Sequence, residues 1–144
     1  MTDEITAGAL DGKFFRQRGG VGYAAEVTVA LTGEAGVELA CSGGGWRGQG
    51  AIEEASATSH AHWQAGARLG VMYALRIAGR EVGVRVVRVA GMTTDTNPTI
   101  VALAAARAVW LAVGFAPSTE LIERFEAQVL SSWQRPYDAL PQLE

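Results

Sequence analysis

The sequence has little charge, a single cysteine and no uninterrupted apolar run long enough to span a membrane. Charged residues make up 19% of the chain and the net charge is −3, so the basic excess typical of proteins that grip nucleic acid is missing. One cysteine, Cys41, excludes an internal disulfide and fits a reducing compartment. The apolar stretch after Asn97 contains Arg107 and predicts a buried helix. The first residues lack a signal-peptide pattern, so we expect a cytoplasmic protein with no membrane partner.

Residues that form a recognisable catalytic or metal-binding set are also scarce. The phosphate-binding pattern GxxxxGK[ST] is absent. His60 and His62 are two positions apart, which suits joint metal binding in an extended loop but not on a helix. Glu53 and Glu54 could act as paired carboxylates, although adjacent glutamates are typical of a solvated segment. We therefore expect no catalytic set, no metal and no cofactor, and Cys41 as a core residue.

The sequence does have the length and composition of one compact domain, since it has 144 residues and 49% of them are apolar. Two extended pieces flank a glycine turn in residues 13–31. Apolar residues alternate with others in 25–31 and again in 36–42, which predicts two strands. The four residues GEAG between them favour a hairpin, so the first third is predicted to be an antiparallel meander.

Helix signals dominate the rest of the chain. A first helix is predicted from a cap at Thr58 or Ser59 to Gly79, after a flexible glycine-rich loop. A strand follows in 81–91. Asn97 and Pro98 are the cap and first residue of a second, largely buried helix that ends at Gly114. A third helix begins near Ser118, and its apolar stripe comprises Ile122, Phe125, Val129 and Trp133.

This order predicts an α+β two-layer sandwich, with a mostly antiparallel sheet, two long helices on one face and an extra C-terminal helix. We divide the chain into an N-terminal arm (1–12), a domain (13–116) and a C-terminal helix and tail (117–144). The apolar stripe of the last segment must be buried. We expect it to pack on the same domain of a monomer, with a homodimer contact as the alternative.

Two stretches resemble the fourth domain of elongation factor G, over roughly residues 13–115. The stretch RQRGGVGY is similar to the family's glycine turn, and VGVRVVRVAG followed by MTTDTNPTIVALAAARAVWLA is similar to its strand, polar tip loop and small-residue helix. The resemblance implies the ribosomal protein S5 domain 2-like fold. It also implies that the tip loop contacts a partner related to the ribosome.

The chain departs from the family at important positions. Thr94 stands where the family's tip loop has a histidine, and Val21 replaces the arginine of the glycine turn, whereas Asp95 keeps an acidic residue. Without a phosphate-binding motif, the chain resembles a free-standing relative of one domain and not a GTPase.

Two functions remain open from the sequence. The first is a non-catalytic interaction module that binds a protein or a structured RNA. The alternative is a small enzyme of the same superfamily acting on an anionic substrate, because a fold does not fix a function. A deep pocket between the tip loop and the histidines would favour the enzyme. The candidate binding residues are Gly19, Gly20, Gly22, Trp46, Arg47, Thr93, Thr94 and Asp95.

Trp46 and a group of arginines carry further alternatives. Trp46 either stacks on a base or peptide of a partner, or folds back into the core. The arginines would form an RNA-binding surface only if they shared one face; otherwise they are ordinary surface charges. The residues concerned are Arg16, Arg18, Arg47, Arg85 and Arg88.

Overall fold

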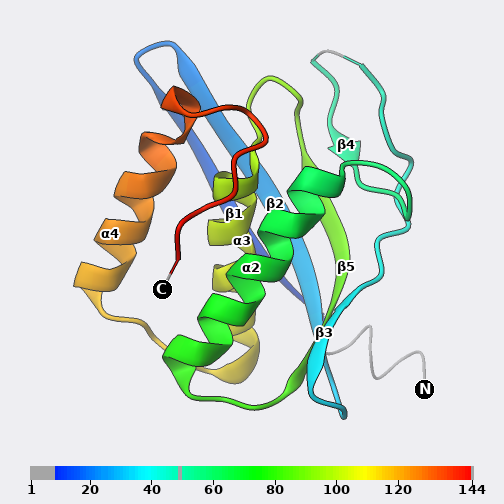
Figure 1. The fold of residues 1–144 in the computed structure, drawn as a ribbon, viewed down its shortest axis with the longest axis vertical. Coiled ribbons are helices and arrows are strands. Elements are labelled where there is room, and N and C mark those ends of the chain that lie inside the picture. The colour runs from blue at the N-terminus through cyan, green and yellow to red at the C-terminus, as the bar shows by residue number, and fades with distance from the viewer. Residues whose placement is uncertain (1–8, 49, 144) are drawn as a thin grey trace.

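The computed structural model describes residues 9–48 and 50–143, which form an α+β fold (Figure 1). A mixed, mostly antiparallel five-stranded sheet has the order β1 (Leu10–Arg18), β2 (Val21–Thr32), β5 (Gly83–Gly91) and β3 (Gly36–Leu39), and β4 (Glu53–Glu54) pairs with β5. Two helices, α2 (Ala61–Ala78) and α3 (Pro98–Val113), cover one face of this sheet, with α3 over β1 and β2 and α2 beside β5 and β3. The predicted fold class is thus confirmed, including a C-terminal helix.

Strands β1 (Leu10–Arg18) and β2 (Val21–Thr32) form the predicted hairpin around two glycines. Gly19 and Gly20 have φ angles of 59° and 81°, which a two-residue hairpin turn requires and which glycine adopts without strain. Residues 10–12, expected in an N-terminal arm, are the first residues of β1. Residues 1–8 of that arm lie outside the described residues.

The expected hairpin between β2 and β3 (Gly36–Leu39) is wrong. Strand β5 (Gly83–Gly91) lies between them, antiparallel to β2 and parallel to β3. The connection from β2 to β3 crosses close to the start of β5. A Cβ on Gly83 would lie only 1.7 Å from the Glu34 carbonyl oxygen in this connection. The missing side chain at Gly83 makes this crossing possible.

A β-bulge in the pairing with β2 explains the irregular spacing of valines in β5. Val84, Val86 and Val89 are all fully buried beneath the helices, although the last two are three positions apart. The extra residue shifts the alternation by one. Arg85 and Arg88 consequently lie on the opposite face.

Helix α2 (Ala61–Ala78) ends at Gly79 as predicted, but it does not begin with a side-chain cap at Thr58 or Ser59. Its N-cap is His60, in a left-handed conformation with φ 54°. Helix α3 (Pro98–Val113) follows the prediction more closely. The Asn97 side chain accepts a hydrogen bond from the Ile100 N–H at its start, and Gly114 ends it.

Helix α4 (Thr119–Leu130) and the short 3-10 helix η1 (Ser132–Gln134) follow, with Ser118 capping α4. Phe125 and Val129 of α4 are buried in the same core as α2 and α3. The C-terminal segment is therefore packed on the domain (Figure 1). No helix in the described part of the chain is long and apolar enough to cross a bilayer.

Candidate functional site

Three connections meet at one end of the molecule, which we call the loop end (Figure 1). They are the β1–β2 turn with the first two residues of β2 (19–22), the segment before α2 that contains the short strand β4 (Glu53–Glu54), and the β5–α3 loop (92–97). All the predicted binding residues belong to these three segments. The structure thus brings together residues that are up to 76 positions apart in the sequence.

The glycine-rich segment that precedes β4, residues 43–48, is folded back on β4 and is not an open loop. The N–H groups of Gly43 and Gly45 donate to the carbonyls of Ala55 and Glu54, at 2.9 and 2.8 Å. A Cβ on Gly43 would lie 2.3 Å from the Glu54 Cβ, so glycine is needed for this close approach. The segment forms a cover over the side chain of Glu53.

Glu53 is the buried centre of the loop end. Its side chain has no exposed surface, and neither does that of His60. One carboxylate oxygen lies 3.0 Å from His60 Nε2 and accepts a 3.1 Å hydrogen bond from Thr93 Oγ1. The other oxygen accepts backbone N–H groups of Arg47 and Gly48 at 2.7 and 2.8 Å. Glu53 thereby joins all of these groups, which come from separate connections.

These hydrogen bonds decide the charge of Glu53. Burial alone raises the pKa of a carboxyl group, but bonds from His60, the two backbone N–H groups and Thr93 outweigh it and lower the pKa of Glu53 to about 2. Glu53 is therefore ionised at neutral pH. Since an ionised carboxylate only accepts hydrogen bonds, His60 Nε2 must carry a proton, and this N–H donates a hydrogen bond to Glu53.

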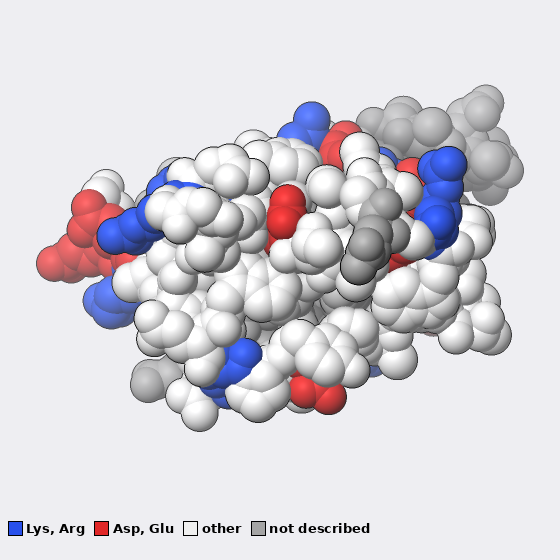
Figure 2. Space-filling model, turned by 90° about the horizontal axis from the view of Figure 1, so that it is seen from above, with Lys and Arg blue, Asp and Glu red and all other residues white. Residues whose placement is uncertain are grey.

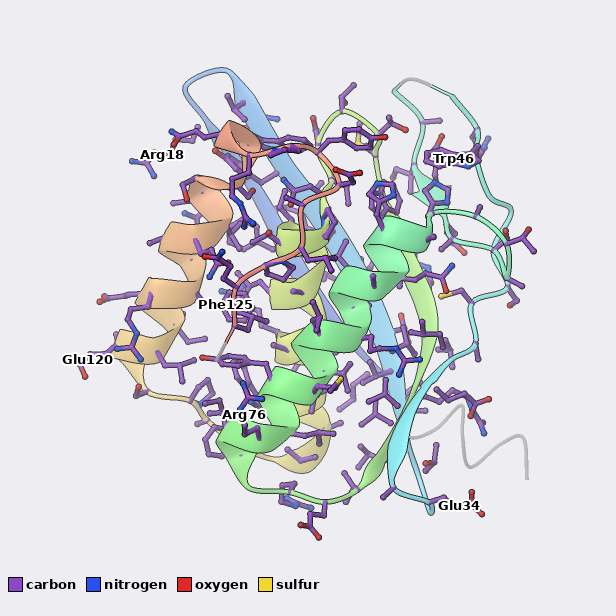
Figure 3. The ribbon with its side chains drawn as sticks, viewed as in Figure 1. Arg18, Glu34, Trp46, Arg76, Glu120 and Phe125 are labelled. Atoms are coloured by element: carbon purple, nitrogen blue, oxygen red, sulfur yellow. The ribbon has the colours of Figure 1, made fainter. Side chains whose placement is uncertain are left out.

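Trp46 lies over the ring of His60. Their ring centroids are 3.7 Å apart, and the ring centroid of Trp63 is 4.3 Å from that of His60. Trp63 is buried, whereas Trp46 remains 56% exposed. Trp46 is thus neither a core residue nor a free side chain, but an exposed residue whose ring packs against a buried one. Figure 3 shows the Trp46 side chain at the loop end. Neither of its two expected placements describes this arrangement fully.

Ser59, His60 and Glu53 contact one another in the order found in hydrolase triads, with 2.8 Å between Ser59 Oγ and His60 Nδ1. Their other contacts do not suit catalysis. Ser59 Oγ also accepts the Ser56 N–H at 2.8 Å and bonds the Ser56 hydroxyl at 2.9 Å, which uses its full hydrogen-bonding capacity. The arrangement positions the cover over Glu53 and leaves no group free to attack a substrate.

The two residues next to this network have other roles. Glu54 points away from Glu53 and pairs with Arg88 at 2.9 Å, so the two glutamates do not act together. His62 packs edge-on against Tyr137, and burial and the nearby His60 lower its pKa. Among the described residues no three His, Cys, Asp or Glu side chains gather as metal ligands. Cys41 is buried, and burial raises the pKa of its thiol.

The β5–α3 loop is tied to its neighbours on both sides. The Asp95 N–H donates to the Met92 carbonyl at 2.9 Å, and the Asp95 carbonyl accepts the Ala24 N–H at 2.8 Å. Gly22 makes room for the Asp95 carboxylate, since a Cβ there would lie 2.6 Å from it. Thr94 is exposed, as expected of a tip residue, whereas Thr93 also supports Glu53.

The arginines do not form one basic surface. Three of the five are paired with glutamates, which reduces their charge toward a polyanion. These pairs are Arg16 with Glu126, Arg85 with Glu38, and Arg88 with Glu26 and Glu54. Figure 2 looks directly at the loop end. Uncharged residues cover most of it, and the Lys and Arg side chains lie toward its margins.

Comparison with known proteins finds a similar fold in part of a larger protein. No family model matches the sequence, and no curated protein matches it significantly. The structure is similar to part of a solved structure from Thermus thermophilus, the protein ttk003000868, with a TM-score of 0.58 and 18% identity. The match covers 88% of this chain and 20% of that protein, so the chain spans about one fifth of its length.

Proposed function

We propose that the chain is a non-catalytic module that binds a protein partner through the loop end. The observation that carries this proposal is Trp46, a residue that is 56% exposed although its ring packs against the buried ring of His60. A rigid exposed aromatic ring adds contact area at little entropic cost, and such residues are enriched among the strongest contributors to protein interfaces.

The charge of the loop end favours a protein over RNA. RNA binding draws much of its affinity from Lys and Arg contacts to phosphates, and here such side chains lie toward the margins (Figure 2). The buried network of Glu53 also favours a binding role over the enzyme alternative, because its groups are engaged with one another. It holds the loops in one geometry before any partner arrives, which reduces the cost of ordering them.

A binding role is also what the resemblance to the fourth domain of elongation factor G implies for a free-standing relative of that domain. In that family the tip loop after the strand is the end that contacts a partner, and residues 92–95 occupy the equivalent place in the order of elements. The partner of this chain and any relation to the ribosome are parts of the same proposal.

Site-specific photocrosslinking tests whether a protein partner binds at the loop end. We expect Trp46→benzoylphenylalanine to yield, in cells, a discrete adduct that protease removes and ribonuclease does not. The control is Leu111→benzoylphenylalanine in α3, since Leu111 is 62% exposed and lies at the opposite end of the domain. A ribonuclease-sensitive adduct, or adducts that are the same from both positions, would contradict a protein partner at the loop end.

A further inference from the structure

The face of the sheet opposite α2 and α3 carries a hollow of about 380 Å³ next to the loop end. It lies across β1, β2 and β5, and reaches Ile52 just before β4. This size is at the lower end of the range for ligand pockets in proteins. The hollow takes no part in the network around Glu53.

Small residues in the central strands create the hollow, and large ones form its sides. Ala24 of β2 and Ala90 of β5 form its floor, and Phe15 is paired with Ala24 from the edge strand β1. Ile52 lies on the far side of β5. Phe15 and Ile52 are 61% and 60% exposed. Two large apolar side chains thus face solvent on opposite sides of an apolar floor, where nothing described of the chain covers them.

A charged side chain lies at each end of the hollow, and only one of the two is paired with opposite charges. At one end Arg88 is neutralised by Glu26 and Glu54, each at 2.9 Å. At the other end the Asp95 carboxylate makes no hydrogen bond or ion pair with any described residue. Its backbone is held by Met92 and Ala24, so this carboxylate is a fixed negative charge at the rim.

We propose that the hollow binds a short segment of a partner protein in which a large apolar side chain stands next to an arginine or lysine. The apolar side chain would be buried between Phe15 and Ile52, and the cation would pair with Asp95. A net charge of −3 on the chain favours the same kind of partner. This inference rests on the proposed function, because it names the chemistry of the protein segment that the loop end receives.

A peptide selection tests the preference directly. A random peptide library displayed on phage is selected against the intact protein, and we expect an apolar residue beside Arg or Lys to be enriched. Selected peptides are then synthesised and titrated. The double variant Phe15→Ala/Ile52→Ala should weaken binding by at least about tenfold, because both apolar sides of the hollow are removed. Leu111→Ala, which removes an equally exposed side chain elsewhere, should leave it unchanged.

A double-mutant cycle tests the contact with Asp95. Replacing the peptide arginine by citrulline, which is neutral and of similar shape, should weaken binding to the wild type about fivefold. With Asp95→Asn the same replacement should change affinity less than twofold. Because the Asp95 carboxylate makes no hydrogen bond or ion pair with a described residue, and asparagine has nearly the same size, circular dichroism should show that this variant is folded.

Three results would overturn the inference. They are selected peptides without a basic residue, equal binding by the wild type and Phe15→Ala/Ile52→Ala, or a wild-type dimer that this double variant abolishes in sedimentation. The last result would assign the hollow to a second copy of the chain. A protein adduct at position 46 that persists in the double variant would leave the proposed function standing while this inference fails.

Discussion

At the scale of single residues, Glu53 connects more of the loop end than any neighbour does. Its four hydrogen-bond partners come from the glycine-rich cover, the N-cap of α2 and the β5–α3 loop. An ionised group without exposed surface is stable only when it is fully bonded, and here every bond also fixes a loop.

Glu53→Gln should therefore lower the free energy of unfolding by about 1–3 kcal/mol, because a neutral amide replaces charge-assisted hydrogen bonds in a buried place. The adjacent Glu54→Gln is the matched control. Glu54 pairs with Arg88 at the surface, so we expect less than about 1 kcal/mol. Urea denaturation of both variants measures the difference. Equal losses would show that the Glu53 network adds nothing beyond a surface ion pair.

The same carboxylate predicts how stability depends on pH. The pKa of Glu53 is about 2 in the folded chain against an ordinary 4.5, so the folded state favours the ionised form. Its contribution should be complete above pH 4.5 and be lost as the pH falls toward 2. Urea midpoints of the wild type and Glu53→Gln should thus converge between pH 4.5 and 2. A constant gap would contradict the low pKa.

Local signals of single residues were predictable from the sequence, and contacts between distant ones were not. Asn97 was recognised as a cap and Ser118 as the start of a helix, because a cap residue bonds to the backbone three residues later, within the same stretch of sequence. The contact of Glu53 with Thr93 spans 40 positions and depends on how β4 pairs with β5. The sequence drew attention to His60 as one of a histidine pair, whereas in the structure His60 bonds to Glu53 and His62 packs against Tyr137.

At the scale of secondary-structure elements, the contact of α2 with α3 depends on two glycines one turn apart. A Cβ on Gly66 would lie 2.3 Å from the Pro98 carbonyl oxygen, and one on Gly70 would lie 2.2 Å from that of Ala102. Helices that approach this closely cannot accept even a methyl group without moving apart.

Gly70→Ala should consequently destabilise the protein by about 1–3 kcal/mol, although alanine is favoured over glycine in a helix by about 1 kcal/mol. The control is Gly44→Ala, where an added Cβ would meet no atom within 4 Å, and we expect a change below about 0.5 kcal/mol. Thermal melts distinguish the two. A stabilised Gly70→Ala would show that helix propensity outweighs the close contact.

The pairing of strands was harder to predict than their existence. Alternation of apolar residues indicated β3 correctly, but this pattern reports only which face is buried and not which strand lies beside it. A short connection favoured a hairpin with β2. Gly83 lets that connection pass over β5 instead. This role of Gly83 is visible only in the structure, where β5 and the β2–β3 connection lie side by side.

At the scale of the whole molecule, the C-terminal segment braces the loop end. The Trp133 indole N–H donates to the Gly22 carbonyl at 3.1 Å, and the Asn97 side chain donates to Ser132 Oγ at 2.9 Å. Tyr23 Oη donates to the Leu130 carbonyl at 2.8 Å. The β5–α3 loop is therefore held from one side by the network of Glu53 and from the other by η1. The β1–β2 turn and the adjoining Tyr23 are held by Trp133 of η1 and Leu130 of α4.

Phe125→Ala should destabilise the entire domain, because Phe125 is 3% exposed and joins α4 to the common core. We expect a loss of about 3 kcal/mol and a melting temperature lower by roughly 10 °C in a single transition. Leu140→Ala, at a position 43% exposed, should shift it by less than about 2 °C. An early, separate transition would instead show that α4 unfolds independently.

The brace also sets an order of events during synthesis. Residues 118–134 emerge from the ribosome after the turn, the glycine-rich cover and the β5–α3 loop, all of which they follow in the chain. A nascent chain can thus assemble its sheet and first helices while Gly22 and Asn97 still lack their contacts with Trp133 and Ser132. The surface at the loop end becomes complete only when this late segment has docked, which delays recognition until the domain is finished.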